Sequence, residues 1–551
     1  MNGGERSGTR WTWLALVAVL LFASALRVRL LDVPLERDEG EYAYAGRLLL
    51  QGVPPFAQAY NMKMPGIYAV YAAMMAAFGQ SVPGIRLGAA LVNAASGLFL
   101  FLALRRRFDL KTSWLCSAGF ALLSLGPAVQ GVMANAETFV LPFALAGLWT
   151  LLAGLDRDRA ALVGLSGLLF GLSGLVKQHG YFLALFGGVY LLGVLAGWSG
   201  RSWRHRVFLV FLFGAGVFLP FVLTAGYFYR VGVFGRFWFW TFTYASRYVS
   251  MTPLSIGLEN FEHQVGRMFH DFPLLLALAG VGLLAPFWDR GSRAAARFTH
   301  PLALFSFLAT CPGLYFRPHY FFLLLPALSL LAAIAVPALA RLWPAGRLKP
   351  RALTAASLFF LAAVVFPLAR NGAFFFAMSP EQACRALYAP NPFPEAVTVS
   401  AYIRERSAPQ DRIAVLGSEP EVYFYADRRA ATGYLYVYAM TEPHAFSLSM
   451  QKEMRAQIEA ARPRFVVLFG NPDFWPLPRM AFLVDWMAEY LPRQYRLVGA
   501  VDVRRPGPSV FVWGERAPGL EPVSEIWIKV FERLAPAETG PALEGRPAPH
   551  L

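Results

Sequence analysis

Three carboxylates stand close together near the start of the chain, in the stretch RDEGEYAYAG at residues 37–46. Asp38, Glu39 and Glu41 follow directly after an apolar run, 11–31, that is long enough to cross a bilayer. Acidic side chains at the mouth of a membrane helix are costly and usually face a polar cavity. A carboxylate there can serve as a general base, bind a cation or cap a helix.

A lysine lies in the same loop. Stretches 40–51 and 65–78 are predicted to be helices in the membrane interface, because their tyrosines suit the level of the lipid headgroups. Lys63 stands between them, in NMKMPG. A carboxylate cluster and a lysine on one loop would suit chemistry on a lipid-borne anion, although a lysine beside a membrane more often snorkels to the headgroups.

The composition is that of a polytopic membrane protein. Of the 551 residues 56% are hydrophobic and 15% are charged, and the mean hydropathy is +0.45. Eleven apolar segments are candidate transmembrane helices, some of them at the short end of the length that a span needs. They are 11–31, 85–104, 114–130, 139–155, 160–176, 181–198, 207–229, 272–288, 301–316, 320–342 and 352–369.

The net charge of +16 is unevenly placed along the chain. Most basic residues fall in alternate connections between the apolar segments, as the positive-inside rule requires when the N-terminus is cytoplasmic. This placement accounts for the charge and argues against a nucleic-acid partner. With eleven spans, everything after about residue 370 is expected on the extracytoplasmic side.

The sequence predicts three regions. Residues 1–370 are expected to form a transmembrane domain, and 371–517 an extracytoplasmic α/β domain in which short strands alternate with helices. Residues 518–551 form a Pro-rich, flexible tail with one apolar patch at 526–534. The expected strands are 412–417, 464–470, 495–503 and 510–514, and the expected helices are 444–461 and 480–491.

Several short motifs occur in a characteristic order and on one side of the membrane. An acidic DE pair followed by YA, at Asp38 to Ala43, precedes the lysine turn at Lys63. ANAETFVLPF (134–143), GLSGLVKQHG (171–180), RPHYFFLLLPAL (317–328) and GSEPEVYFYADRR (417–429) follow. This pattern resembles glycosyltransferase family 39, which includes protein O-mannosyltransferases and the bacterial lipid A aminoarabinose transferase, all of the GT-C superfold. Met64 departs from it, since relatives often have proline there.

The resemblance implies a membrane-embedded glycosyltransferase of the bacterial inner membrane. It would move a sugar from a polyprenyl-phosphate-linked donor to an extracytoplasmic acceptor with inversion. Asp38 matches the family's first acidic position and would be the general base, with Glu39 beside it as a second catalytic candidate. Glu39 and Glu41 could equally orient the acceptor, bind a metal with Asp38 or cap the helix. Lys63 is the first choice for the donor phosphate.

Further polar residues on the same side of the membrane are candidate substrate-binding residues. Each has a structural alternative: Glu137 as an acid at a helix N-terminus, Lys177 as a base at a helix C-terminus, and the arginine and histidine of RPHY as interfacial anchors. The substrate-binding set is Tyr42, Lys63, Glu137, Lys177, His179, Arg317 and His319.

The remaining expectations concern partners and rival functions. The acceptor would be a glycolipid, a polysaccharide or a protein, and the membrane lipids are the other partners. No cofactor is required by any motif; a divalent cation, Mg²⁺ or Mn²⁺, and its ligands are left open. The alternatives are a transporter or flippase of polyprenyl-linked glycans, and a non-catalytic protein of surface-polysaccharide assembly.

Overall fold

The computed structural model describes residues 3–198, 200–343, 348–505 and 507–535, and the chain forms two compact units. The first unit comprises Met1–Asp32, Lys63–Arg230 and Tyr248–Met378, and the second comprises Val33–Met62, Val231–Arg247 and Ser379–Leu551. The second unit therefore takes in two segments that the sequence assigned to the membrane domain ending at residue 370. Both segments pack on the C-terminal part of the chain, as described below.

The first unit consists of apolar helices. In the described residues six helical stretches are long and apolar enough to span a membrane, or seven if the bent pair α12–α13 counts as one. Each of the eleven predicted segments overlaps a helix, but several helices are too short to qualify by length. The helices are α1 (Gly3–Arg29), α3 (Gly66–Phe78), α4 (Val82–Leu104), α5 (Leu110–Leu123), α6 (Ala136–Arg157), α7 (Ala160–Val176), α8 (Gly180–Ala196), α9 (Trp203–Arg230), α12 (Leu254–Asp271), α13 (Pro273–Leu284), α14 (Arg290–Leu308), α15 (Leu325–Ala340) and α16 (Leu348–Arg370).

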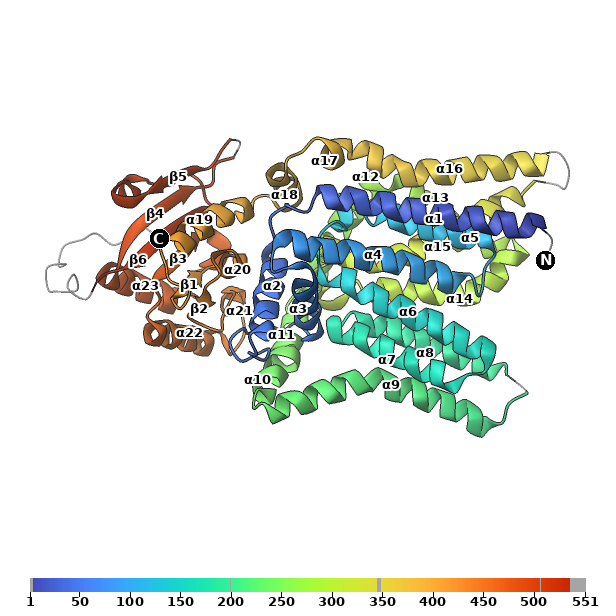
Figure 1. The fold of residues 1–551 in the computed structure, drawn as a ribbon, viewed down its shortest axis with the longest axis horizontal. Helices are drawn as coiled ribbons and strands as arrows, with labels where there is room; N and C mark the ends of the chain where they lie inside the picture. Colours follow the sequence, from blue (N-terminus) through green and yellow to red (C-terminus); the bar gives the residue numbers. More distant parts are fainter. Residues whose placement is uncertain (1–2, 199, 344–347, 506, 536–551) are drawn as a thin grey trace. The chain divides into compact units, whose positions relative to one another are not determined.

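Glycines allow close packing between helices α7 and α9 of this unit. A Cβ at Gly167 of α7 would lie 2.1 Å from the backbone oxygen of Phe213 in α9, and one at Gly171 would lie 2.3 Å from that of Val217. Backbones that approach this closely are typical of membrane helix pairs, where small residues form the interface. Figure 1 shows α6, α7, α8 and α9 running alongside one another.

The second unit contains a mixed sheet with the strand order β2-β1-β3-β6-β4-β5 (Figure 1). Strand β1 pairs in parallel with β2 and β3, whereas β6 is antiparallel to both β3 and β4. The strands are β1 (Arg412–Leu416), β2 (Arg429–Ala430), β3 (Phe465–Gly470), β4 (Tyr495–Asp502), β5 (Val510–Trp513) and β6 (Trp527–Arg533). The accompanying helices include α18 (Pro380–Tyr388), α19 (Phe393–Glu405), α20 (Glu421–Ala426), α22 (Ser447–Ala461) and α23 (Ala481–Gln494).

Strand β6 corrects the prediction of a flexible tail from residue 518. It lies between β3 and β4 and pairs with β3 from Gly470↔Trp527 to Phe465↔Glu532. Ile528 and Val530 are fully buried, so the apolar patch recognised at 526–534 is a strand of the core. The rest of the expected tail, 536–551, lies outside the described residues.

Helix α2 (Arg37–Leu50) carries the acidic stretch and belongs to the second unit. Its N-cap is Glu36, whose carboxylate accepts the Glu39 N–H at 3.1 Å, while the Glu39 carboxylate accepts the Glu36 N–H at 3.1 Å. This reciprocal capping box explains why the helix begins at Arg37 and not near Gly40. Gly40 then allows α2 to lie directly against the backbone of Glu421 in α20.

An aromatic run, FGRFWFWTFTYASRY at 234–248, belongs to the second unit as far as Arg247. It forms α10 (Phe234–Trp238), the π-helical segment η2 (Phe239–Tyr244) and α11 (Ala245–Val249). The ring of Trp240 lies 6.2 Å from that of Tyr60 and 6.0 Å from that of Tyr434, measured between centroids. Trp240 is buried, so this part of the run contributes to a protein core.

The contact at Gly40 leads to a stability prediction. A Cβ there would lie 2.5 Å from both the Cβ and the backbone nitrogen of Glu421, so Gly40→Ala must push α2 and α20 apart. We expect a loss of about 1–3 kcal/mol, typical of overpacking. Thermal unfolding of the purified protein in detergent measures it. Gly235→Ala in α10, where no atom lies within 4 Å, is the control and should not destabilise; equal stability of both variants would contradict the packing described.

Candidate functional site

A buried ion pair lies at the centre of the polar site in the first unit. Glu137 stands in the first turn of α6, and Lys177 follows the last residue of α7. The Lys177 Nζ donates to the Glu137 carboxylate, and the two side chains are only 7% and 1% exposed. Such a pair is stable in an apolar interior only when further polar contacts support it.

Aromatic and imidazole rings surround the Lys177 ammonium. Its Nζ lies 4.4 Å from the ring centroid of Tyr320, which places the cation over the π-face. The rings of His179 and His319 lie 4.6 Å and 5.0 Å from that of Tyr320, and His319 Nδ1 lies 3.1 Å from Gln130 Oε1. The structure thus brings Glu137, Lys177, His179 and His319 together, four of the residues that the sequence offered as substrate-binding candidates.

Three buried polar atoms of this cluster have no hydrogen-bond partner among the described residues. They are Glu137 Oε2, His179 Nδ1 and Asn135 Nδ2. Buried polar groups are nearly always satisfied in folded proteins, so unpartnered ones mark a place where a ligand or water completes the set. The cluster offers both donor and acceptor atoms for a polar ligand.

Lys63 reaches this region through the packing of α3. A Cβ at Gly66 would lie 2.5 Å from the carbonyl oxygen of Leu175, so α3 begins against the end of α7. The Tyr71 hydroxyl donates to the Ala134 carbonyl at 2.6 Å and ties α3 to the segment before α6. Burial and the positive charges of Lys177, His319 and Lys63 lower the pKa of His179 well below its usual value, so His179 is a neutral ring beside two lysines.

Arg317 makes different contacts from the cluster. Its side chain is exposed, and its guanidinium carbon lies 5.5 Å from the ring centroid of Tyr315, which stacks on Tyr248. Both interpretations that the sequence offered for Arg317, substrate binding and interfacial anchor, therefore stay predictions.

The acidic residues of α2 are positioned within the second unit. Asp38 is half-buried, and the hydroxyl of the fully buried Tyr42 donates to its Oδ2 at 3.4 Å. Asp38 lies in the first helical turn, where the N-terminal end of the helix dipole stabilises negative charge. Among the three acids of the stretch, Asp38 is the one that remains partly accessible.

Glu39 and Glu41 are buried, and both make structural contacts. Glu39 completes the capping box with Glu36. The Glu41 Oε2 accepts from Asn61 Nδ2 at 2.6 Å and from the Tyr436 hydroxyl at 2.8 Å. Glu41 therefore connects α2 to the end of its own loop and to the segment after β2, and Glu39 fits the capping alternative.

Arg37 is the residue that sequence reasoning missed. Its guanidinium donates to Glu419 Oε1 at 3.1 Å, to Asn391 Oδ1 at 3.1 Å and to the carbonyl of Ser418. The rings of Phe393, Tyr438 and Phe474 lie around it with centroids 5.5, 5.1 and 5.7 Å from its guanidinium carbon. The motif GSEPEVYFYADRR contained the signal, because its first acid, Glu419, is the partner of the residue next to Asp38.

Three buried acids, Glu419 among them, lie near this arginine. Burial and the neighbouring charges of Asp38 and Glu39 raise the pKa of Glu36 to about 8. Burial raises the pKa of Glu419 in spite of the opposing charge of Arg37, and burial together with Glu419 raises that of Glu421 well above its usual value. Neither carboxylate oxygen of Glu421 has a hydrogen-bond partner among the described residues.

The described part of the chain contains no group of three or more His, Cys, Asp or Glu side chains placed to hold a metal ion. The sequence left a divalent cation open, and these residues identify no set of ligands for it.

The buried pair predicts non-additive stability effects. Lys177→Met leaves the Glu137 carboxylate buried and unpaired, which should cost about 3–5 kcal/mol in detergent unfolding. Glu137→Gln combined with Lys177→Met should recover most of that loss. Lys111→Met, at an exposed lysine that bonds Ser357, is the control. A double variant as unstable as Lys177→Met alone would argue against the pair.

The raised pKa values predict a dependence of stability on pH. Glu36 binds a proton more tightly in the folded protein, so its contribution is fully present below its usual pKa of 4.5 and is lost as pH rises to about 8. The raised pKa of Glu421 acts in the same direction. Glu421→Gln should lose less stability than wild type between about pH 5 and pH 8. Glu515→Gln, at an exposed position, should follow wild type; parallel curves for all three proteins would refute this origin.

Part of this chain is similar in sequence to known transferases. The family described as dolichyl-phosphate-mannose-protein mannosyltransferase matches residues 62–224, which include Lys63, Glu137, Lys177 and His179. The undecaprenyl phosphate-alpha-4-amino-4-deoxy-L-arabinose arabinosyl transferase of Pseudomonas paraeruginosa is 31% identical over 248 residues, 42% of each chain. The corresponding protein of Pseudomonas aeruginosa strain LESB58 is 32% identical over 221 residues, 37% of this chain and 38% of the relative. The matches thus span less than half of the curated relatives.

The likeness to solved structures extends over nearly the whole chain. ArnT from Cupriavidus metallidurans bound to undecaprenyl phosphate superposes with a TM-score of 0.55 at 18% identity, over 92% of this chain and 98% of that one. The Archaeoglobus fulgidus oligosaccharyltransferase superposes with a TM-score of 0.52 at 14% identity, over 91% and 74%. With its apolar helices and these neighbours, the chain is a multi-pass membrane protein, and it has the GT-C fold of these membrane glycosyltransferases.

Proposed function

We propose that this protein is an integral membrane glycosyltransferase that moves a sugar from a polyprenyl-phosphate-linked donor to an acceptor. The observation that carries the proposal is the buried cluster of Glu137, Lys177 and His179, with unpartnered polar atoms on Glu137 and His179. A non-catalytic scaffold has no need to bury an ion pair beside polar atoms that lack hydrogen-bond partners. The fold shared with ArnT bound to undecaprenyl phosphate supports the choice of donor class.

In the proposed reaction Asp38 is the general base. An acceptor hydroxyl attacks the anomeric carbon of the donor sugar from the face opposite the phosphate, and its proton passes to the Asp38 carboxylate. The new C–O bond forms as the bond to the phosphate oxygen breaks, so the configuration inverts and polyprenyl phosphate leaves. No general acid is needed, because the phosphate is already a good leaving group. The partial exposure of Asp38 and its contact with Tyr42 support this role.

Lysines provide the positive charge for the phosphate. Lys63 is the first choice, with Lys177 as the second cation; after burial, the charges of both lysines contribute to the lowered pKa of His179, which supports their being close to this ring. Fixed cations in a site with little water stabilise charge that develops on a leaving phosphate more strongly than they would in water. Glu137 acts as the counter-ion that holds Lys177 in position.

The proposal includes the topology and the acceptor class. The N-terminus is cytoplasmic, the protein lies in the bacterial inner membrane with about eleven spans, and the second unit faces the extracytoplasmic side. Basic residues concentrated in alternate connections support this orientation. The acceptor is a glycolipid, a surface polysaccharide or a protein; the names of the Pseudomonas relatives support an aminoarabinose-like donor sugar.

A transfer assay tests the proposal. Membranes carrying the protein receive undecaprenyl phosphate-linked 4-amino-4-deoxy-L-arabinose in which the sugar is labelled. The label is then counted in the glycolipid, polysaccharide and protein fractions. Asp38→Asn should reduce the rate by about 10²–10⁴, the usual contribution of a general base. Lys63→Ala should weaken both donor binding and turnover, since the lost charge contacts the phosphate in both states.

Matched variants make the assay specific. Asp32→Asn, at an exposed acid just before the acidic stretch, and Lys452→Ala, at an exposed lysine, should transfer at the wild-type rate. Full turnover in Asp38→Asn would remove the base assignment. Transfer in no fraction, together with no donor binding by wild type, would refute the glycosyltransferase proposal with this donor class.

A further inference from the structure

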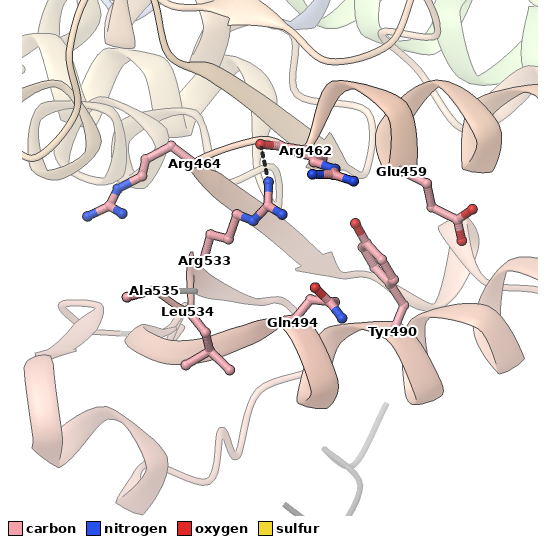
Figure 2. A pocket seen from close by; sticks show the side chains of 8 residues that line it. All are labelled: Glu459, Arg462, Arg464, Tyr490, Gln494, Arg533, Leu534 and Ala535. Atoms are coloured by element: carbon pink, nitrogen blue, oxygen red, sulfur yellow. Dashed lines mark hydrogen bonds between the residues drawn. The ribbon is translucent and has the colours of Figure 1, made fainter. Parts of the chain in front are cut away.

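A polar cavity lies in the second unit, and none of the residues assigned to the transferase site lines it. Its volume is about 850 Å³. Three of its lining residues are arginines, at the end of α22, just before β3 and at the end of β6, and in Figure 2 the Arg464 guanidinium points away from those of Arg462 and Arg533. It is lined by Glu459, Arg462, Arg464, Tyr490, Gln494, Arg533, Leu534 and Ala535.

The three arginines are held in different ways. Arg533 donates from its guanidinium to the carbonyl of Arg462 at 3.1 Å, which fixes its position at the wall of the pocket. Arg464 pairs with Glu532, an acid that also bonds Arg496. The Arg462 guanidinium forms no hydrogen bond or ion pair with any other residue that the structure describes. Arg462 also adopts a left-handed backbone, with φ of 48°, as it ends α22.

The acid among the lining residues is already paired. Glu459 Oε1 accepts from the indole nitrogen of Trp486 at 2.9 Å and from Arg455 Nε at 3.0 Å. Arg455 is not among the lining residues, and its positive charge offsets the negative charge of Glu459. The cavity therefore keeps an excess of positive charge, which attracts anions.

The opposite wall comes from one side of α23. Tyr490 stacks on Trp486 with ring centroids 5.0 Å apart, which holds its ring in place, and Gln494 follows one turn later. A tyrosine ring offers an apolar face and a hydroxyl, and a glutamine amide offers both a donor and an acceptor. Sugars present the same mixture of C–H faces and hydroxyl groups.

We propose that this pocket binds an anionic saccharide, a sugar that carries a phosphate or a carboxylate group. Arg462 and Arg533 contact the anionic group, for which the planar guanidinium is suited. Tyr490 and Gln494 contact the sugar ring. The proposal concerns binding alone and requires neither a donor nor transfer, so its failure is distinguishable from failure of the transferase proposal.

Equilibrium dialysis of the full-length protein in detergent tests the proposal. The probes are labelled glucose 6-phosphate, glucuronate, glucose and inorganic phosphate, used one at a time. Glucose 6-phosphate, glucuronate or both should bind saturably and more weakly at high salt, because added salt screens the arginines. Glucose should not bind, and inorganic phosphate should bind at least tenfold more weakly than the better saccharide.

Two variants with opposite expected effects locate the binding. Arg462→Gln breaks no described side-chain contact, and it should weaken binding about tenfold or more through loss of a charged hydrogen bond. Glu459→Gln removes the pocket's negative charge and should strengthen binding. Arg516→Gln removes an exposed arginine outside the lining and is the matched control.

The proposal is overturned if neither charged sugar binds, or if Arg462→Gln binds as tightly as Arg516→Gln. Equal binding of inorganic phosphate and glucose 6-phosphate would overturn the assignment to a saccharide. A shift in opposite directions for Arg462→Gln and Glu459→Gln supports it.

Discussion

The ion pair between Arg37 and Glu419 is the contact on which the geometry of the second unit depends most. It joins the first residue of α2 to the loop that follows β1, two segments almost four hundred positions apart in the chain. Three aromatic rings enclose the arginine and limit its hydration, so the carboxylate must supply the lost polar contacts. Because Asp38 is the next residue, the same contact determines where the first turn of α2 presents this half-buried acid.

The first unit also contains a buried ion pair, but this pair lies beside polar atoms that have no partner among the described residues. Lys177 and Glu137 neutralise each other at the ends of two apolar helices, and Tyr320 covers the ammonium. A buried pair of this kind gives little net stability compared with apolar packing, because both ions lose their hydration. Its presence beside unpartnered polar atoms is therefore better explained by ligand chemistry than by folding.

The sequence predicted features that depend on local pattern. The helices expected at 40–51 and 65–78 and the strands expected at 412–417 and 464–470 are present, although the first helix already begins at Arg37. The sequence groups Glu137 with Lys177 because the predicted topology puts both on the same side of the membrane. Local pattern could not reveal that the first loop packs with the C-terminal part, since the partner of Arg37 is chosen by tertiary contact. For the same reason β6 was assigned to a tail: a short apolar strand among prolines has no local signal of its central place in a sheet.

The central place of β6 has a consequence for biogenesis. Strands β3 and β4 are not neighbours until β6 enters between them, and β6 follows all five other described strands in the chain. While the chain is being synthesised, both strands therefore have an unpaired edge with free N–H and C=O groups, which invites pairing with other chains. The sheet can close only after β6 has been synthesised, so until then those edges need protection from pairing with other chains.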